Sequence, residues 1–248
     1  MPSVSLCEVN TMAGIARIPD HGDLWRVPWT VLEGNACSCT MVGRCFSLPL
    51  QLRRAASVSR AGGGSRLYLE YQLSNLGHNS APWAWSAHPL FAVTPGDRIL
   101  LPESLRSVRV EGSIGERLDQ AGAIAGWPVA KTSGSGFADL SIAEGLETGH
   151  ADKLFAGPLK ENENWCVLER RTAGVRIRMS FDAAATPFLG LWLCYGGWPA
   201  RPGPKQMCVA LEPATCGVDS LAYAGRWGRV LEPGASYSWE ISAEFQLL

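Results

Sequence analysis

Residues 236–247 alternate polar and apolar side chains without interruption. Six apolar residues, from Tyr237 to Leu247, occupy every second position, and serine, glutamate or glutamine occupies the positions between them. Because successive side chains of a strand point to opposite faces, a period of two predicts a strand with one buried face and one hydrated face. Such strands are typical of antiparallel sheets, so we expect this segment to close an all-β fold.

The same period of two recurs in residues 66–74 and 174–181, where apolar side chains fill one face of each expected strand. Glycine and proline turn signals separate these strands, and no long amphipathic helix competes with them. Residues 119–125 are a candidate for a short helix, which Gly122 disfavours. The pattern therefore predicts an antiparallel β-sandwich. The 248 residues contain no repeat and no evident linker, so we expect a single domain over residues 1–248.

The charge distribution argues against two classes of partner. The formal net charge is −1, and a glycine run at 62–64 interrupts the arginines within residues 53–66, which fits a hydrated hairpin. Binding to nucleic acid or to an anionic membrane surface needs clustered positive charge, so neither partner is expected. The sequence has no run of about 18 apolar residues that would predict a membrane span, and no secretory signal is evident. We expect a cytoplasmic protein with a small or neutral partner, and the oligomeric state is not predicted.

Eight cysteines are scattered through apolar and turn contexts of the chain. This distribution favours reduced, mostly buried thiols over a disulfide framework. The cluster of Cys37, Cys39 and Cys45 lacks paired CxxC spacing and a nearby histidine, so no metal site is predicted there. The full set is Cys7, Cys37, Cys39, Cys45, Cys166, Cys194, Cys208 and Cys216.

Two ionisable residues stand in unusual surroundings. His88 lies among aromatic residues in the segment 83–91, and Pro89 favours an extended backbone at His88. This histidine is either a proton donor or a buried side chain bonded to a carbonyl, and the segment alone favours the structural role. Glu212 follows the apolar run 209–211 and precedes a proline. Partial burial there would raise the pKa of Glu212, whereas a surface glutamate at a strand end is the ordinary alternative.

A third candidate lies upstream, in the triplet Asp20-His21-Gly22, which is followed by Trp25. The triplet can place His21 where the backbone lies close to a ligand, with Trp25 as a flat apolar surface beside it. The same triplet is typical of an ordinary turn before a strand, and these residues alone favour that interpretation.

Several short motifs follow one another in a consistent order along most of the chain. They are the His-Gly pair at 21–22, a strand ending in asparagine at 71–75, a histidine-aromatic motif at 87–91, a glutamate motif at 209–213 with Asp219-Ser220, and Pro233-Gly234 before the final strand. In this order they resemble the motifs of the aldose 1-epimerase, or galactose mutarotase-like, family. Each motif is weak by itself, and the shared order carries the resemblance.

The resemblance implies a β-supersandwich and the interconversion of the α and β anomers of a hexose by ring opening and reclosure. It assigns Glu212 as general base, His88 as general acid and His21 as a ligand of a sugar hydroxyl. These roles suit the chemistry, which removes a proton from the anomeric hydroxyl and delivers one to the ring oxygen. The reaction needs no metal and no cofactor. A noncatalytic sugar-binding or regulatory module of the same fold is the alternative.

Four more residues have both a binding role and an alternative. Asp152 is placed where the family has an additional acidic sugar ligand, or it lies in a surface turn. Trp85 presents an aromatic face to the sugar or packs in the core, and Asn75 bonds the pocket or ends its strand. The family's upstream arginine has no counterpart among the twenty residues before His21, so Arg26 replaces it or lies solvated at a strand edge. The chain is therefore either truncated at its amino end, begun at a misassigned start, or a reduced member of the family, and each alternative leaves the activity open.

Overall fold

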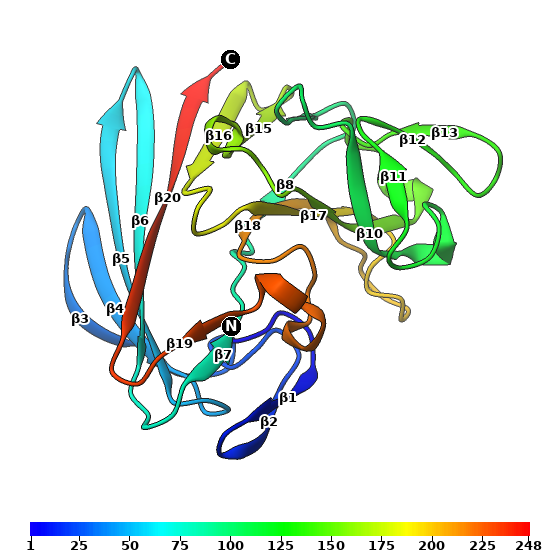
Figure 1. Ribbon diagram of the computed structural model, residues 1–248. Helices are drawn as coiled ribbons and strands as arrows, with labels where there is room; N and C mark the ends of the chain where they lie inside the picture. The colour runs from blue at the N-terminus through cyan, green and yellow to red at the C-terminus, as the bar shows by residue number, and fades with distance from the viewer.

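A computed structural model describes residues 1–248, apart from the side chain of Ala61. Strand β20 (Ser236–Leu247) has the bounds expected from its alternation, and it lies inside an eight-stranded antiparallel sheet, between β6 and β16. Figure 1 shows this sheet with β5, β6 and β20 side by side. In spatial order its strands are β3 (Thr30–Asn35), β4 (Ser38–Arg44), β5 (Leu50–Ala61), β6 (Gly64–Asn75), β20, β16 (Val175–Phe181), β15 (Trp165–Arg170) and β9 (Arg98–Leu100).

A second antiparallel sheet has six strands and lies beside the first, around β17 and β18 in Figure 1. Its central strand β17 is buried along nearly its whole length. In spatial order the strands are β11 (Ile124–Gly126), β10 (Ser107–Ser113), β14 (His150–Ala156), β17 (Phe188–Tyr195), β18 (Met207–Ala214) and β8 (Leu90–Ala92).

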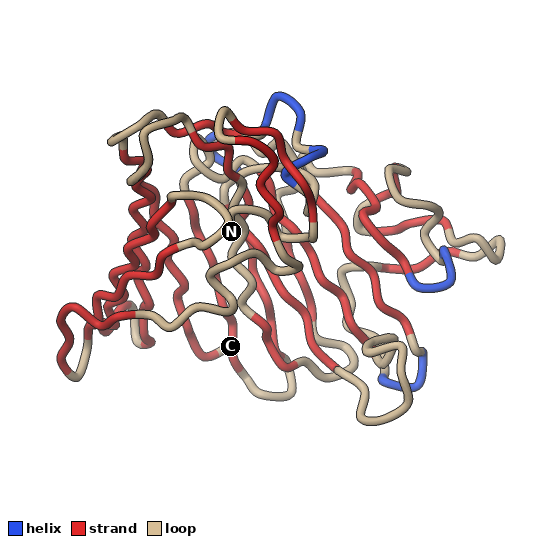
Figure 2. Tube along the Cα trace, turned by 90° about the horizontal axis from the view of Figure 1, so that it is seen from below, coloured by secondary structure: helices blue, strands red, loops and turns tan.

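Three two-stranded pairs and five short 3₁₀ turns complete the chain, and Figure 2 shows how little of the trace is helical. The pairs β1–β2 and β7–β19 lie near the amino terminus, below β17 and β18 in the view of Figure 1. The pairs are β1 (Cys7–Thr11) with β2 (Gly14–Ile18), β12 (Val129–Lys131) with β13 (Phe137–Asp139), and β7 (Ala81–Trp83) with β19 (Arg229–Leu231). The 3₁₀ turns are η1 (Ile114–Glu116), η2 (Leu146–Thr148), η3 (Glu161–Glu163), η4 (Leu221–Tyr223) and η5 (Gly225–Trp227).

The apolar face of β20 forms the centre of the core. Trp239 is 4 % exposed, and the ring centroids of Tyr71, Trp83 and Trp85 lie 5.4, 5.7 and 5.1 Å from its own. The same continuous core includes Leu154 and other inward residues of the six-stranded sheet. Each large side chain buried there contributes about 1.5–3 kcal/mol through removal of apolar surface from water. The core therefore holds the two sheets together.

The all-β, antiparallel fold class is confirmed, but the short helix considered for residues 119–125 is wrong. Asp119 and Gly122 have φ angles of 86° and 94°, in the left-handed region that right-handed helices exclude, and β11 begins at Ile124. All eight cysteines are free; four of them are buried and Cys37 is exposed. Among the described residues, no helix combines the length and the apolarity needed to cross a bilayer.

Candidate active site

The register of β8 on β18 places His88 beside Glu212. Leu90 pairs with Ala210, and Ser86 forms an isolated bridge to Ala214, so a step of two residues from either pair sets His88 opposite Glu212. The side chains meet in that position, with Nδ1 of His88 2.8 Å from Oε1 of Glu212. The hydroxyl of Ser86 donates a 3.3 Å hydrogen bond to Oε2. Two residues separated by 124 positions thus form one contact through strand pairing.

Lys153 is the second partner of Glu212. The two side chains meet above Gly190, which has no side chain to separate them. Gly190 on β17 pairs with Glu212 on one side and with Phe155 on the other, while Lys153 lies two residues before Phe155 on the same face of β14. The ammonium of Lys153 donates to Oε2 of Glu212. A Cβ at Gly190 would lie 3.1 Å from Oε2 and 3.2 Å from Nζ of Lys153. The absence of a side chain at this one position opens the space across β17.

The carboxyl group of Glu212 is fully buried, and its partners keep it ionised. Burial by itself would raise the pKa of Glu212, because a charged carboxylate loses its hydration. The Lys153 ammonium and the hydrogen bond from His88 outweigh burial and hold the pKa of Glu212 below its ordinary value. The result is a negatively charged acceptor that solvent does not reach.

A second carboxylate, Asp219, lies on the other side of the Lys153 ammonium, with Oδ1 3.6 Å from Nζ. Burial raises the pKa of Asp219 to about 6, although Lys153 opposes that change, and the negative charges of Glu212 and Glu111 add to it. The backbone carbonyl of Asp219 accepts hydrogen bonds from the N–H groups of Val4 and Ser5. The amino-terminal segment is therefore attached directly to the wall of the site.

His21 approaches from that amino-terminal segment. Its φ of 62° and that of Gly22, 71°, form a left-handed turn in which a Cβ at Gly22 would lie 2.5 Å from the carbonyl oxygen of Met1. The ring centroid of His21 is 6.3 Å from that of His88 and 5.4 Å from that of Trp25. The structure thus brings His21, His88 and Glu212 into one cluster, with the exposed ring of Trp25 at its edge.

Two other predicted sugar contacts have structural roles away from this cluster. The amide of Asn75 donates to the carbonyls of Asn79 and Leu231 and accepts from the N–H of Gly77, so it holds the loop after β6. Trp85 is 5 % exposed, and its ring packs in the core. For both residues the structural alternative describes the observed contacts.

Asp152 faces the opposite side of the sheet from Glu212. Adjacent strand residues point to opposite faces, so Asp152 turns away from the site when Lys153 turns toward it. Asp152 is fully buried, accepts a 2.6 Å hydrogen bond from the hydroxyl of Ser113, and pairs with Arg117. The Arg117 guanidinium also bonds Glu144 at 2.9 Å. This ion network is a structural element of the core face.

Arg26 is exposed at a turn, where its backbone N–H donates to the carbonyl of Asp23. No ion pair joins its guanidinium to a carboxylate among the described side chains. Arg26 is therefore near His21 in sequence but forms no ion pair with Glu212.

The sequence did not assign Lys153 or Trp192 to the site. Trp192 on β17 pairs with Lys153 and with Ala210, on the same face as Glu212, and its ring meets the half-exposed ring of Trp198 edge to face at 6.5 Å. The sequence does show that Lys153 and Phe155 share one face of a strand-like run. Without the register of β14 on β17, however, the sequence does not show whether that face carries Glu212.

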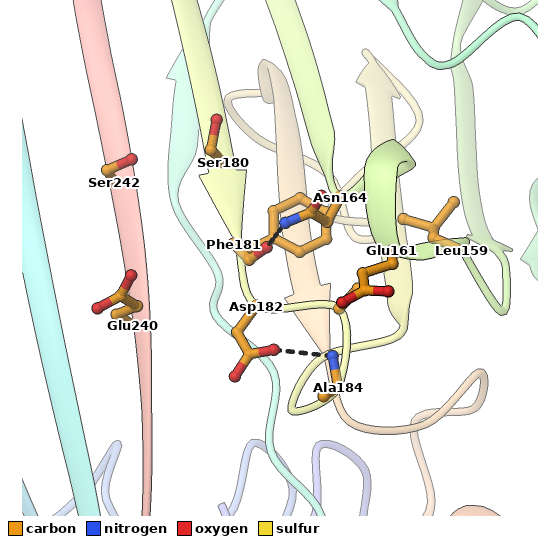
Figure 3. A pocket seen from close by; sticks show the side chains of 10 residues that line it. Leu159, Glu161, Asn164, Ser180, Phe181, Asp182, Ala184, Glu240 and Ser242 are labelled. Atoms are coloured by element: carbon orange, nitrogen blue, oxygen red, sulfur yellow. Dashed lines mark hydrogen bonds between the residues drawn. The ribbon is translucent and has the colours of Figure 1, made fainter.

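A hollow of about 710 Å³ lies elsewhere, on the eight-stranded sheet and its loops (Figure 3). Its lining includes Ser242, Asn164 and Asp182. Asn164 donates to the carbonyl of Phe181, and Asp182 accepts from the N–H of Ala184 at 2.8 Å. Local backbone groups thus occupy Asn164 and Asp182, and no histidine is among the residues that line the hollow. Among the described residues, no group of three metal-ligating side chains comes together.

Comparison with solved structures shows the galactose mutarotase-like fold. The Slr1438 protein from Synechocystis sp. PCC 6803 aligns with a TM-score of 0.72 at 16% identity, over 100% of this chain and 77% of that one. A galactose mutarotase-like protein from Lactobacillus casei ATCC 334 gives 0.67 at 17% identity, over 99% and 83%. A galactose mutarotase related enzyme from Lactobacillus acidophilus gives 0.66 at 14% identity, over 96% and 78%. No protein-family model and no curated protein sequence matches the chain.

Proposed function

We propose that this protein is an aldose 1-epimerase that interconverts the α and β anomers of a hexose. The observation that carries the proposal is the 2.8 Å contact between Nδ1 of His88 and Oε1 of a buried, ionised Glu212. The anomeric hydroxyl and the ring oxygen of an aldose are attached to the same carbon. A base and an acid that serve these two oxygens must therefore lie within a few ångströms of each other, as this pair does.

The proposed reaction balances with two proton transfers. Glu212 takes the proton of the anomeric hydroxyl while the imidazolium of His88 gives a proton to the ring oxygen. The bond between the anomeric carbon and the ring oxygen breaks, and its electron pair stays on that oxygen as the carbonyl forms. Rotation about the bond between the first two carbons presents the other carbonyl face, and the reverse transfers close the ring. Since Nδ1 of His88 faces Glu212, the proton for the sugar comes from Nε2.

His21 and Trp25 supply the proposed wall of the sugar site. An imidazole can bond a sugar hydroxyl, and a flat indole can pack against the apolar C–H face of a pyranose. The His21 ring is half-exposed and lies next to both Trp25 and His88. We assign both residues to substrate binding.

Saturation-transfer NMR of a hexose measures anomer exchange directly and tests the proposal. We expect acceleration by the wild-type protein and a loss of about 100-fold or more in both His88→Asn and Glu212→Gln, since general acid–base groups contribute factors of that size. His78→Asn is the matched control, because His78 borders a hollow whose lining includes neither His88 nor Glu212. If the folded wild-type protein leaves the exchange rate of a broad hexose panel unchanged, the proposed activity is refuted.

A noncatalytic sugar-binding module is the second candidate, and the three hydrogen bonds that Glu212 accepts within the protein favour it. Both carboxylate oxygens already have partners, in His88 on one side and in Lys153 and Ser86 on the other. Each of these donors stabilises the ionised form and so weakens proton uptake by Glu212, whereas sugar binding alone requires no proton transfer. A sugar that raises the melting temperature of the protein, but whose anomer exchange the protein does not accelerate, would identify the binding module.

A further inference from the structure

Cys194 and Cys208 are directly opposite each other in the six-stranded sheet. Cys194 on β17 is the register partner of Cys208 on β18, so both side chains point to the same face. Opposed residues of an antiparallel pair have Cα atoms about 4.5–5.5 Å apart. Disulfide-bonded residues span about 4.4–6.8 Å between Cα atoms, so strand pairing alone sets a separation that a disulfide accepts.

We propose that Cys194 and Cys208 form a reversible dithiol–disulfide site. None of the other six cysteines has a cysteine as its register partner: Cys7 pairs with Ile18, Cys39 with Gly34 and Ala56, and Cys166 with Met179. The Cys216 thiol lies 3.2 Å from the carbonyl oxygen of Val218. Of the eight thiols, the strand pairing selects this one pair.

The chemistry of the pair supports reaction at neutral pH. A hydrogen bond from the Cys208 thiol lowers the pKa of Cys194 to about 7, although burial opposes the change. The interaction with Cys194, together with burial, raises the pKa of Cys208, whose thiol also donates to Oε1 of Gln206 at 4.0 Å. The pair therefore carries one shared proton and one negative charge in a pH range where an ordinary thiol is protonated. Thiolate is the form that attacks disulfides.

The exposure of Cys208 allows a small reagent to reach the pair. Cys194 is fully buried, whereas Cys208 is partly exposed and lies beside Ala92 at the end of β8. The connection from β17 to β18 reaches solvent through the half-exposed Trp198. A small soluble disulfide can thus reach the pair through Cys208, while the buried sulfur is protected from larger reagents.

The exchange balances with a small disulfide such as oxidised glutathione as the oxidant. The shared proton moves to Cys194, and the accessible Cys208 thiolate attacks one glutathione sulfur. The glutathione S–S bond breaks, and the departing glutathione thiolate takes the proton from Cys194. The Cys194 thiolate then attacks the Cys208 sulfur of the mixed disulfide and releases the other glutathione as a thiolate, which takes a proton from water. Both cysteines are oxidised, and one glutathione disulfide is reduced to two thiols. The bond would close the β17–β18 hairpin without a contact to His88 or Glu212, so the inference is independent of the proposed function.

Incubation of the full chain with oxidised glutathione, followed by alkylation of free thiols and mass spectrometry, tests the site. We expect the protein to lose the mass of two hydrogen atoms, with tryptic peptide 179–205 joined to peptide 206–226. Because the second peptide also contains Cys216, fragmentation must place the bond at Cys208. The rate of cross-linking should rise with a midpoint near pH 7. Reduced dithiothreitol should restore both thiols.

Three single variants complete the test. Cys208→Ser and Cys194→Ser should abolish the cross-link, and Cys37→Ser, which removes an exposed thiol, should leave its rate unchanged. The oxidised wild-type protein should melt at a higher temperature than the reduced form, since the bond closes a loop in the unfolded chain. A folded protein that gives only mixed glutathione adducts overturns the proposal. A bond that persists in Cys208→Ser also overturns it.

Discussion

Replacement of Lys153 by methionine tests whether the ammonium keeps Glu212 ionised. Methionine preserves most of the side-chain length and removes the charge, which leaves a fully buried carboxylate with His88 and Ser86 as its partners. In the variant, burial still raises the pKa of Glu212. With the Lys153 charge removed, the hydrogen bond from His88 is the main interaction that opposes this rise. We expect the pKa of Glu212 to move from below to above its ordinary value.

The magnitude follows from the burial of the pair. The side chains of Lys153 and Glu212 are 12% and 0% exposed, so screening by water is weak. Loss of one partner from a buried ion pair typically costs about 3–5 kcal/mol of unfolding free energy. Glu212 can reduce that cost by binding a proton, by about 1.4 kcal/mol for each unit by which its raised pKa exceeds the pH. The full loss is therefore expected only where the carboxylate must stay ionised.

The sign of the pH dependence distinguishes loss of the charge from a packing defect. In the wild type, the lowered pKa of Glu212 gives stability that is present above the unfolded value and lost as the pH falls through the folded value. In the variant, a raised pKa makes stability fall as the pH rises through the unfolded value toward the folded one. The difference between the two proteins should thus be larger near pH 8 than near pH 5.

Urea denaturation at the two pH values measures this difference. Lys131→Met is the matched control, because Lys131 is exposed on β12 and the substitution is the same. Lys153→Arg keeps the positive charge and should retain most of the pH dependence of the wild type. An equal loss for Lys153→Met at both pH values would show that packing, and not the charge of Lys153, stabilises this region.

Two further substitutions test groups around the site. Asp219→Asn should remove a pH dependence of about 3 kcal/mol, because the pKa of Asp219 is raised from 3.8 to about 6 and each unit corresponds to about 1.4 kcal/mol. Wild-type stability should fall relative to the variant as the pH rises from 3.8 to 6, which urea denaturation measures. Asp23→Ala should cost about 3 kcal/mol or more in the same assay, because its buried carboxylate accepts from the N–H groups of Phe46 and Ser47 at 2.9 and 2.8 Å.

The strands that the sequence predicted are those with one buried and one hydrated face. β6, β16 and β20 belong to this class, and their bounds lie within two residues of the expected ranges. β17 was not predicted, because both of its faces are covered and the alternation disappears. Strands of three residues, such as β8, are too short to show a period. Local pattern therefore located the eight-stranded sheet better than the sheet that carries the site.

The site shows the same division between local pattern and tertiary pairing. His88 and Glu212 were predicted from the order of short motifs, but their contact depends on the pairing of β8 with β18 and on the bridge at Ser86. Asn75 ends one of these motifs and Trp85 lies two residues before another, and their side chains contact the loop after β6 and the core, respectively. A motif identifies a segment, whereas the register decides which of its side chains reach the site.

The adjacent residues Asp152 and Lys153 illustrate this effect of register. The resemblance placed an acidic sugar ligand in this part of the chain, and a shift of one residue along a strand exchanges its two faces. Here the carboxylate faces Ser113 and Arg117 on the core side, and the ammonium faces Glu212. The base proposed for ring opening therefore has a cation beside it where an acidic ligand was expected. A cation that lowers the pKa of Glu212 keeps it ready to accept a proton over a wider pH range, but weakens the proton affinity of the base.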